Sequence, residues 1–136
     1  MNPMRKLPQP TAESKPFWQG GASNTLLIRR CKTCQKYHHP PLPNCPHCLS
    51  WSVQPESVSG RARVVSFTIN HQAWYPGMAV PFVIAYVSIV EQDDIWLMTN
   101  IVGCAPEDVA IGQLVGVSFE QREDVWIPQF TPLEET

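Results

Sequence analysis

Four of the five cysteines form two C-x2-C pairs, Cys31 with Cys34 and Cys45 with Cys48, and ten residues separate the pairs. Each pair sets two thiols on one tight turn, where both sulfurs can bind the same ion at about 2.3 Å. Two such turns facing each other supply four thiolates in a tetrahedron, which is the arrangement that Zn²⁺ prefers. The spacing therefore predicts one structural zinc ion, with iron in a rubredoxin-like site as the alternative.

Two other interpretations of the cysteine pairs are disulfides and redox-active C-x-x-C motifs. The first ten residues contain charges but no apolar stretch, so they do not read as a signal peptide. Without a sign of secretion, and with free-thiol chemistry implied, we expect a cytoplasmic protein. A redox motif would occur once, whereas this chain has a spaced pair. Zinc is therefore favoured over both.

The histidines near the cysteines are not expected to be ligands. His38, His39 and His47 lie close to the cysteines in the sequence. Four sulfurs already fill a tetrahedron, so no coordination position is left for an imidazole. Trp51 follows the second pair and is expected to pack over the metal site.

The composition favours a mainly β protein. The 136 residues are 43% hydrophobic and include 14 prolines, a proline content that argues against a helical bundle. No apolar run is long enough to cross a membrane, so no membrane partner is expected. Only 16% of the residues are charged, which is low for a free-standing soluble monomer and favours a protein partner.

The charges are divided unevenly along the chain. Residues 1–63 contain nine Lys or Arg and two acids, a net charge of +7. Residues 64–136 contain one Arg and ten acids, a net charge of −9. Such a division indicates two different surfaces, unless it is an uneven scatter of solvated charge.

The first part of the chain is predicted to be an arm followed by a zinc ribbon. Residues 1–24 form a proline-interrupted arm with a short helix, which carries Phe17 and Trp18 and stops at Gly20 and Gly21. Phe17 and Trp18 either pack in the core or form a partner interface. Residues 25–56 are the four-cysteine ribbon, which a strand enters at its start. A module this small has almost no core, so metal binding supplies most of its folding energy.

Residues 57–136 change to the period-two alternation of strands. A long first strand is expected to bend at Gly60, and a helical turn at 106–109 precedes the fourth strand. Five short strands in this order favour a closed OB-fold barrel over a β-sandwich fragment. The predicted strands span 58–70, 82–90, 95–102, 115–120 and 125–130.

The order of these features resembles the family known as domain of unknown function 35, or DUF35. In that family a rubredoxin-like zinc ribbon precedes an OB-fold, and the likeness covers residues 13–132. The matching motifs are Phe17-Trp18, the two cysteine pairs, Pro40-Pro41, Gly60, Val64-x-Ser66-Phe67-Thr68, Pro81-Phe82-Val83, Asn100, Pro106-Glu107-Asp108-Val109-x-Ile111-Gly112 and Phe130-x-Pro132.

This chain departs from the family pattern at three positions. Gln35 and Leu49 follow the last cysteine of each pair, where the family usually has glycine. Glycine relaxes such turns, so we expect slight strain there. Ala62 replaces a second strand glycine, which leaves the depth of the first bend open.

The resemblance implies an accessory subunit of an acyl-CoA-processing complex. Family members accompany thiolase-like enzymes, including ketothiolases, hydratase partners and aldolases that shorten steroid side chains. The thiolase-fold partner supplies the catalytic residues, so none is predicted here and we expect a hetero-oligomer. The accessory chain helps to assemble the complex and to shape the acyl-CoA channel.

Five residues are candidates for binding the acyl-CoA substrate. Arg61 and Arg63 suit the phosphates of CoA or an acidic partner surface. His71 follows the long first strand and precedes Trp74 and Tyr75 in a loop with aromatic character. This set is predicted to line the ligand channel or to contact the partner.

Single-stranded nucleic-acid binding is the alternative function, because zinc ribbons and OB barrels both serve it. The net charge of −9 on residues 64–136 would repel a phosphate backbone. The aromatic residues also lack the interleaved basic residues of a stacking groove. We therefore expect no nucleic-acid partner.

Overall fold

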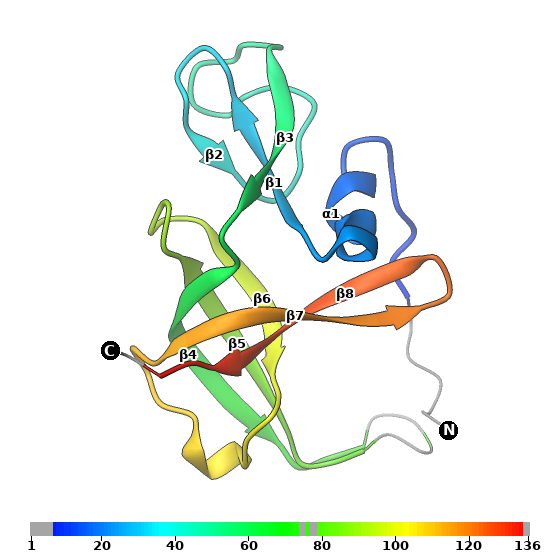
Figure 1. The fold of residues 1–136 in the computed structure, drawn as a ribbon, viewed down its shortest axis with the longest axis vertical. Coiled ribbons are helices and arrows are strands. Elements are labelled where there is room, and N and C mark those ends of the chain that lie inside the picture. The colour runs from blue at the N-terminus through cyan, green and yellow to red at the C-terminus, as the bar shows by residue number, and fades with distance from the viewer. Residues whose placement is uncertain (1–6, 74–75, 77–78, 135–136) are drawn as a thin grey trace.

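In the computed structural model, which describes residues 7–73, 76 and 79–134, a small three-stranded sheet stands above a five-stranded barrel (Figure 1). The first sheet contains the cysteine pairs, and the barrel is built from the second half of the chain. Of the predicted site residues, Trp74 and Tyr75 lie outside the described part. Within the described part, no helix is long and apolar enough to cross a membrane.

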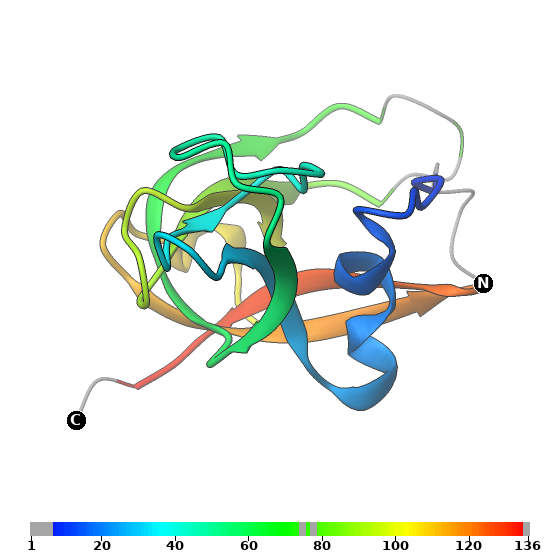
Figure 2. The same cartoon turned by 90° about the horizontal axis from the view of Figure 1, so that it is seen from above.

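The N-terminal arm ends in two short helical segments, α1 (Lys15–Gln19) and η1 (Gly20–Ser23). Viewed from above, they lie beside the small sheet and over one end of the barrel (Figure 2). A Cβ atom added at Gly21 would come within 2.4 Å of Cβ of Trp126. Gly21 therefore lets η1 approach the barrel more closely than a larger residue would allow.

The zinc ribbon is an antiparallel sheet in the order β2-β1-β3. Its strands are β1 (Leu26–Cys31), β2 (Tyr37–His38) and β3 (Val53–Val58). The predicted boundary between residues 56 and 57 falls inside β3.

Gly60 separates two strands that we predicted to be one. We predicted a single bent strand over 58–70, but β3 ends at Val58 and β4 (Arg61–Asn70) begins after the glycine. Gly60 has a φ of +83°, which a residue with a side chain rarely adopts. The chain turns here from the ribbon sheet into the barrel.

The remaining strands close the barrel in the order β4-β5-β6-β8-β7, which confirms the predicted mainly β fold. The elements after β4 are β5 (Phe82–Ile89), β6 (Trp96–Ile101), η2 (Pro106–Asp108), β7 (Leu114–Arg122) and β8 (Val125–Pro132). β5 pairs with both β4 and β6.

Two hydrogen bonds help to close the barrel where β6 meets β8 in parallel. The Val102 N–H donates to the Phe130 carbonyl at 2.8 Å. The buried Thr99 hydroxyl donates to the Pro128 carbonyl at 2.9 Å. Phe130 is fully buried, and alternate residues of β5 pack with it in the core: Val83, Ala85, Val87 and Ile89.

Candidate metal centre and neighbouring surfaces

The four predicted ligands meet at the tip of the ribbon. Their sulfur atoms all lie within 4.8 Å of one another. Cys31 Sγ lies 3.6 Å from Cys48 Sγ, and Cys34 Sγ lies 3.6 Å from Cys45 Sγ. Four sulfurs bound at 2.3 Å to a tetrahedral ion would be about 3.8 Å apart. The spacing therefore fits one zinc ion, which these four cysteines would hold.

Backbone N–H groups point at the first sulfur of each pair. Thr33 and Cys34 donate to Cys31 Sγ at 3.3 and 3.4 Å. His47 and Cys48 donate to the second such sulfur, Cys45 Sγ, at 3.3 and 3.5 Å. These donors stabilise thiolate charge, so each turn is arranged for a metal-bound sulfur.

The thiol pKa values also differ between the first cysteine, Cys31, and the last, Cys48. The backbone N–H of Cys34, together with that of Thr33, lowers the pKa of Cys31 to about 6. A backbone hydrogen bond from Ser50 favours the Cys48 thiolate, but burial and the three neighbouring sulfurs outweigh it and raise the pKa of Cys48 to about 11. Four sulfurs this close resist full deprotonation unless a cation shares the site.

The residue after each cysteine pair adopts a left-handed conformation. Gln35 has a φ of 67° and Leu49 a φ of 66°. The predicted strain in both turns is therefore confirmed, since a Cβ atom in this region costs about 1–2 kcal/mol. The first turn has additional support, because Arg30 Nε donates to the Gln35 carbonyl at 2.8 Å and Arg30 pairs with Glu56 at 3.1 Å.

Trp51 does not cover the metal site, so that expectation is wrong. Its side chain is 73% exposed. The Cys45 N–H donates to the Ser50 carbonyl and closes the second turn one residue before Trp51.

A four-sulfur site has a structural role. All four positions of a tetrahedral ion would be occupied by protein sulfur, which leaves none for a substrate or for water. The ion would supply folding energy to a sheet that has little core of its own. The four cysteines thus lie close enough together to bind one zinc ion, as the sequence predicts.

Family models match both halves of the chain. The model described as the ChsH2 rubredoxin-like zinc ribbon domain matches residues 18–52, and that of the ChsH2 C-terminal OB-fold domain matches residues 56–120. A DUF35 domain-containing scaffold protein from Methanocaldococcus jannaschii is 34% identical over 102 residues, which are 73% of this chain and 71% of that protein. The chain belongs to the DUF35 family.

Other relatives of this DUF35 chain are named as enzyme subunits. A probable enoyl-CoA hydratase alpha subunit from Thermomonospora curvata is 34% identical over 118 residues, or 85% of this chain. A 3-oxo-4,17-pregnadiene-20-carboxyl-CoA hydratase alpha subunit from Mycobacterium tuberculosis is 31% identical over 112 residues, or 82% of this chain. The chain spans only 36% and 35% of their lengths, about a third of each.

Solved structures show the same arrangement of ribbon and barrel. A chain of the solved Ltp2-ChsH2(DUF35) aldolase is 30% identical, with a TM-score of 0.83 over 93% of this chain and 98% of that one. A DUF35 protein of unknown function from Sulfolobus solfataricus is 18% identical, with a TM-score of 0.62 over 89% of this chain and 85% of that one. This second likeness concerns the fold alone.

The predicted substrate-binding residues that the structure describes lie toward opposite ends of β4. Arg61 and Arg63 begin β4 and are exposed, and Arg63 donates to the Gly112 carbonyl at 3.0 Å. His71 is exposed beyond the other end of the same strand. Ten residues of strand would separate them by roughly 30 Å if it were straight. The two arginines and His71 therefore remain separate predictions.

Phe17 and Trp18 differ in their surroundings. Phe17 is buried, and its ring meets Trp18 edge-on and His39 in a tilted contact, each at 4.9 Å between ring centroids. Trp18 is partly buried against the same core cluster. Both residues thus have a packing role within the chain, and their place in a partner interface remains a prediction.

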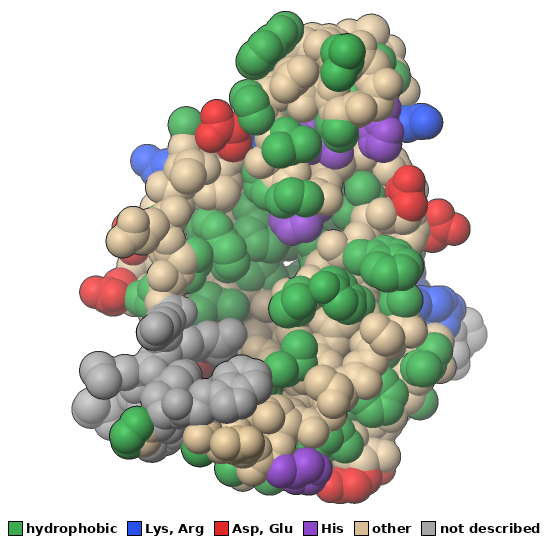
Figure 3. Space-filling view, turned by 180° about the vertical axis from the view of Figure 1, so that it is seen from behind, with side chains coloured by type: hydrophobic (Ala, Val, Ile, Leu, Met, Phe, Trp, Pro, Cys, Tyr) green, Lys and Arg blue, Asp and Glu red, His purple; other side chains and the backbone are tan. Residues whose placement is uncertain are grey.

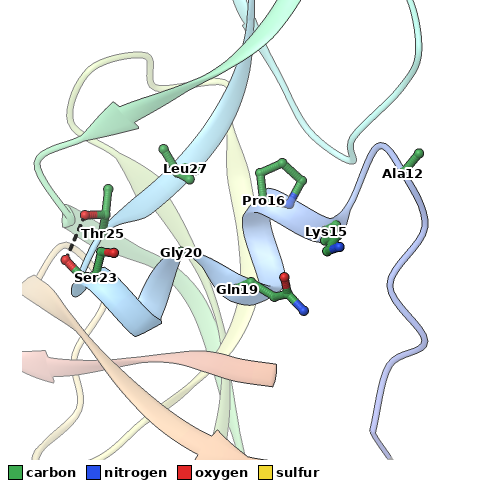
Figure 4. A pocket seen from close by; sticks show the side chains of 8 residues that line it. All are labelled: Ala12, Lys15, Pro16, Gln19, Gly20, Ser23, Thr25 and Leu27. Atoms are coloured by element: carbon green, nitrogen blue, oxygen red, sulfur yellow. Dashed lines mark hydrogen bonds between the residues drawn. The ribbon is translucent and has the colours of Figure 1, made fainter. Parts of the chain in front are cut away.

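A cleft of about 460 Å³ lies between α1 and β1 and was not anticipated from the sequence (Figure 4). Lys15 is the one charged residue of its lining, which is too little to define an anion site. The other lining residues are Ala12, Pro16, Gln19, Gly20, Ser23, Thr25 and Leu27.

The outer face of β5 and β6 was not anticipated from the sequence either. Tyr86 and Trp96 point outward there and remain exposed, although both belong to strands with a buried opposite face. The period-two pattern could have revealed this exposed apolar face, because large apolar residues occupy the outward as well as the inward positions of both strands.

Proposed function

We propose that this DUF35 chain is the auxiliary, largely non-catalytic subunit of an acyl-CoA-processing complex. Its partner is a thiolase-fold subunit that carries the catalytic residues, as in a ketothiolase or an aldolase that cleaves a steroid side chain. The chain helps to assemble the hetero-oligomer and to complete the channel for the acyl-CoA.

The observation that carries this proposal is the likeness to the aldolase structure. That likeness extends over 93% of this chain and 98% of the other, so it includes the arm, the ribbon and the barrel together. The name of that aldolase joins a ChsH2 DUF35 component with a second component, Ltp2. Two sequence relatives are named as alpha subunits of CoA-ester hydratases, which supports a role beside a CoA-dependent enzyme.

The metal centre supports an auxiliary role over an independent catalytic one. A four-cysteine zinc site has no open position, so it cannot polarise a thioester or activate water. Its contribution is to fix the ribbon in one conformation. The ribbon and the barrel then present a defined surface to the partner.

Arg61 and Arg63 are the groups that we assign to the CoA phosphates. They are two residues apart on β4 and therefore share the outer face of the barrel. Exposed guanidinium groups with this spacing suit a diphosphate, because each can donate two hydrogen bonds to one phosphate. His71, with Trp74 and Tyr75, is assigned to the wall of the acyl-CoA channel or to the partner contact.

Native purification tests the proposal. The tagged chain is isolated from its own cells under mild conditions, and the proteins that accompany it in stoichiometric amount are identified by mass spectrometry. We expect a thiolase-fold subunit, with an acyl-CoA in the complex. A stoichiometric companion of another fold, or a chain that remains alone and turns over an acyl-CoA by itself, would contradict the proposal.

A further inference from the structure

The outer face of the barrel carries large apolar side chains that the fold does not bury. In β5 and β6 alternate residues point into the barrel, and the residues between them point to solvent. Three outward side chains are both large and exposed: Tyr86 at 39%, Trp96 at 49% and Met98 at 65%. We refer to Tyr86, Trp96 and Met98 as the sheet patch.

The three residues of the sheet patch are neighbours. Tyr86 lies directly opposite Met98 in the pairing of β5 with β6. The ring centroids of Tyr86 and Trp96 are 6.0 Å apart. Directly paired side chains on one face of a sheet have Cβ atoms about 5 Å apart, so the three form one continuous apolar surface.

The centre of the sheet patch is uncharged, and Arg63 borders it, because Arg63 pairs with Ser88 and Ser88 pairs with Trp96. Segments 66–70, 82–88 and 96–101 of β4, β5 and β6 contain no Asp, Glu, Lys or Arg. The exposed hydroxyl residue Ser66 pairs with Tyr86 from the neighbouring strand β4. Seen from behind, hydrophobic side chains are spread over the face of the molecule, and acidic and basic side chains flank them on both sides (Figure 3).

We propose that the sheet patch is the docking surface for the partner subunit, an inference that rests on the proposed function. Trp, Tyr and Met are enriched at the centres of protein interfaces, and charged residues are depleted there. The barrel core does not need these side chains, since the opposite face of the same strands supplies Val83, Val87 and Leu97. Their exposure is therefore explained by an external partner.

The size of the patch favours a different subunit over a second copy of this chain. Three side chains at these exposures present a few hundred Å² of apolar surface. Obligate homodimers bury roughly 1,000 Å² or more from each subunit, and their interfaces are more apolar. A smaller apolar centre with polar and charged residues at its border matches a standard interface of about 800 Å² a side. The partner surface should likewise have an apolar centre.

The substitution Met98→Lys tests the inference. Met98 is the most exposed member of the patch, whereas Trp96 Nε1 donates to the Asp93 carbonyl at 3.1 Å and helps to hold the β5–β6 turn. Ile111→Lys is the matched control, because Ile111 is 71% exposed in the connection between η2 and β7, outside the sheet patch. Zinc content and melting temperature establish that both variants are folded.

Binding is measured by calorimetry against the purified subunit that accompanies the wild-type chain. We expect Met98→Lys to raise Kd at least tenfold and Ile111→Lys to change it less than twofold. Equal Kd values for wild type and Met98→Lys, or equal losses in both variants, would overturn the inference. A wild-type dimer in sedimentation that Met98→Lys dissociates would also overturn it, in favour of a second copy. If the accompanying subunit lacks a thiolase fold, the proposed function fails, but the tenfold effect on that subunit still decides the inference.

Discussion

The side-chain amide of Gln92 pairs with both backbone polar groups of Tyr37. The Tyr37 N–H donates to Gln92 Oε1 at 2.9 Å, and Gln92 Nε2 donates to the Tyr37 carbonyl at 3.1 Å. Gln92 belongs to the turn between β5 and β6, whereas Tyr37 begins β2 at the edge of the ribbon sheet. The barrel thus satisfies backbone groups of an edge strand that would otherwise be open. Beside it, Glu91 accepts a hydrogen bond from the Ser59 N–H at 2.6 Å.

We predict that Gln92→Glu destabilises the protein by roughly 1–3 kcal/mol, because the carboxylate cannot donate to the Tyr37 carbonyl and leaves it unpaired. Gln72→Glu makes the same change at an exposed loop position and serves as the control. Urea unfolding of the zinc-loaded proteins measures the difference. Identical unfolding midpoints for the two variants would show that the Gln92 pairing contributes nothing to the connection between ribbon and barrel.

The left-handed conformation at Leu49 leads to a second prediction. Leu49→Gly should stabilise the zinc-loaded protein by roughly 0.5–1 kcal/mol, since glycine removes the steric cost but adds freedom to the unfolded chain. Leu49→Ala keeps the Cβ atom and should not stabilise. The Leu49 side chain is 70% exposed, so its removal costs little packing. Equal stabilities of the glycine and alanine variants would contradict strain at this turn.

The metal ligands are tested with the fifth cysteine as an internal control. Cys48→Ser should lose bound zinc and the ordered ribbon, because a structural zinc ion supplies on the order of 10 kcal/mol of folding energy. Cys104→Ser removes a cysteine outside the four-sulfur cluster and should keep one zinc ion per chain. Elemental analysis of the purified variants measures the metal. One zinc ion per chain in Cys48→Ser would exclude the four-cysteine site.

His39 should make the stability depend on pH. Burial and, to a smaller extent, the neighbouring His38 lower the pKa of His39 to about 4. The unfolded chain takes up this proton near pH 6.5 and the folded chain does not, so the stabilisation is complete above pH 6.5 and is lost as the pH falls toward 4.

The variant His39→Phe removes this titration and keeps an aromatic ring next to Phe17. Between pH 7 and pH 5 the wild type should therefore lose on the order of 1–2 kcal/mol more stability than the variant. Unfolding in urea at both pH values gives the comparison. Parallel losses in the two proteins would show that His39 is not kept neutral by the fold.

The local features of the fold could be predicted from the sequence because they depend on spacing and alternation. The cysteine pairs defined the metal site, and period-two alternation located the barrel strands to within a few residues. The break between β3 and β4 was missed, because the sequence does not show that Gly60 adopts a φ of +83° and turns the chain between two strands. The exposure of Trp51 was missed because an aromatic residue beside a metal site is usually buried.

Features that depend on pairing between distant segments could not be predicted from the sequence. The contact between Gln92 and Tyr37 joins residues 55 positions apart and needs the barrel to be placed under the ribbon. The sheet patch could be recognised only from the register of β5 and β6, which brings Tyr86 opposite Met98.

The most direct test of the proposed auxiliary role compares acyl-CoA turnover by three preparations: this chain alone, the subunit that co-purifies with it alone, and the two combined. We predict no turnover by this chain, weak or unstable activity of the partner, and full activity at an equimolar ratio. Turnover by the zinc-loaded chain alone, or full activity of the partner without it, would contradict the auxiliary role.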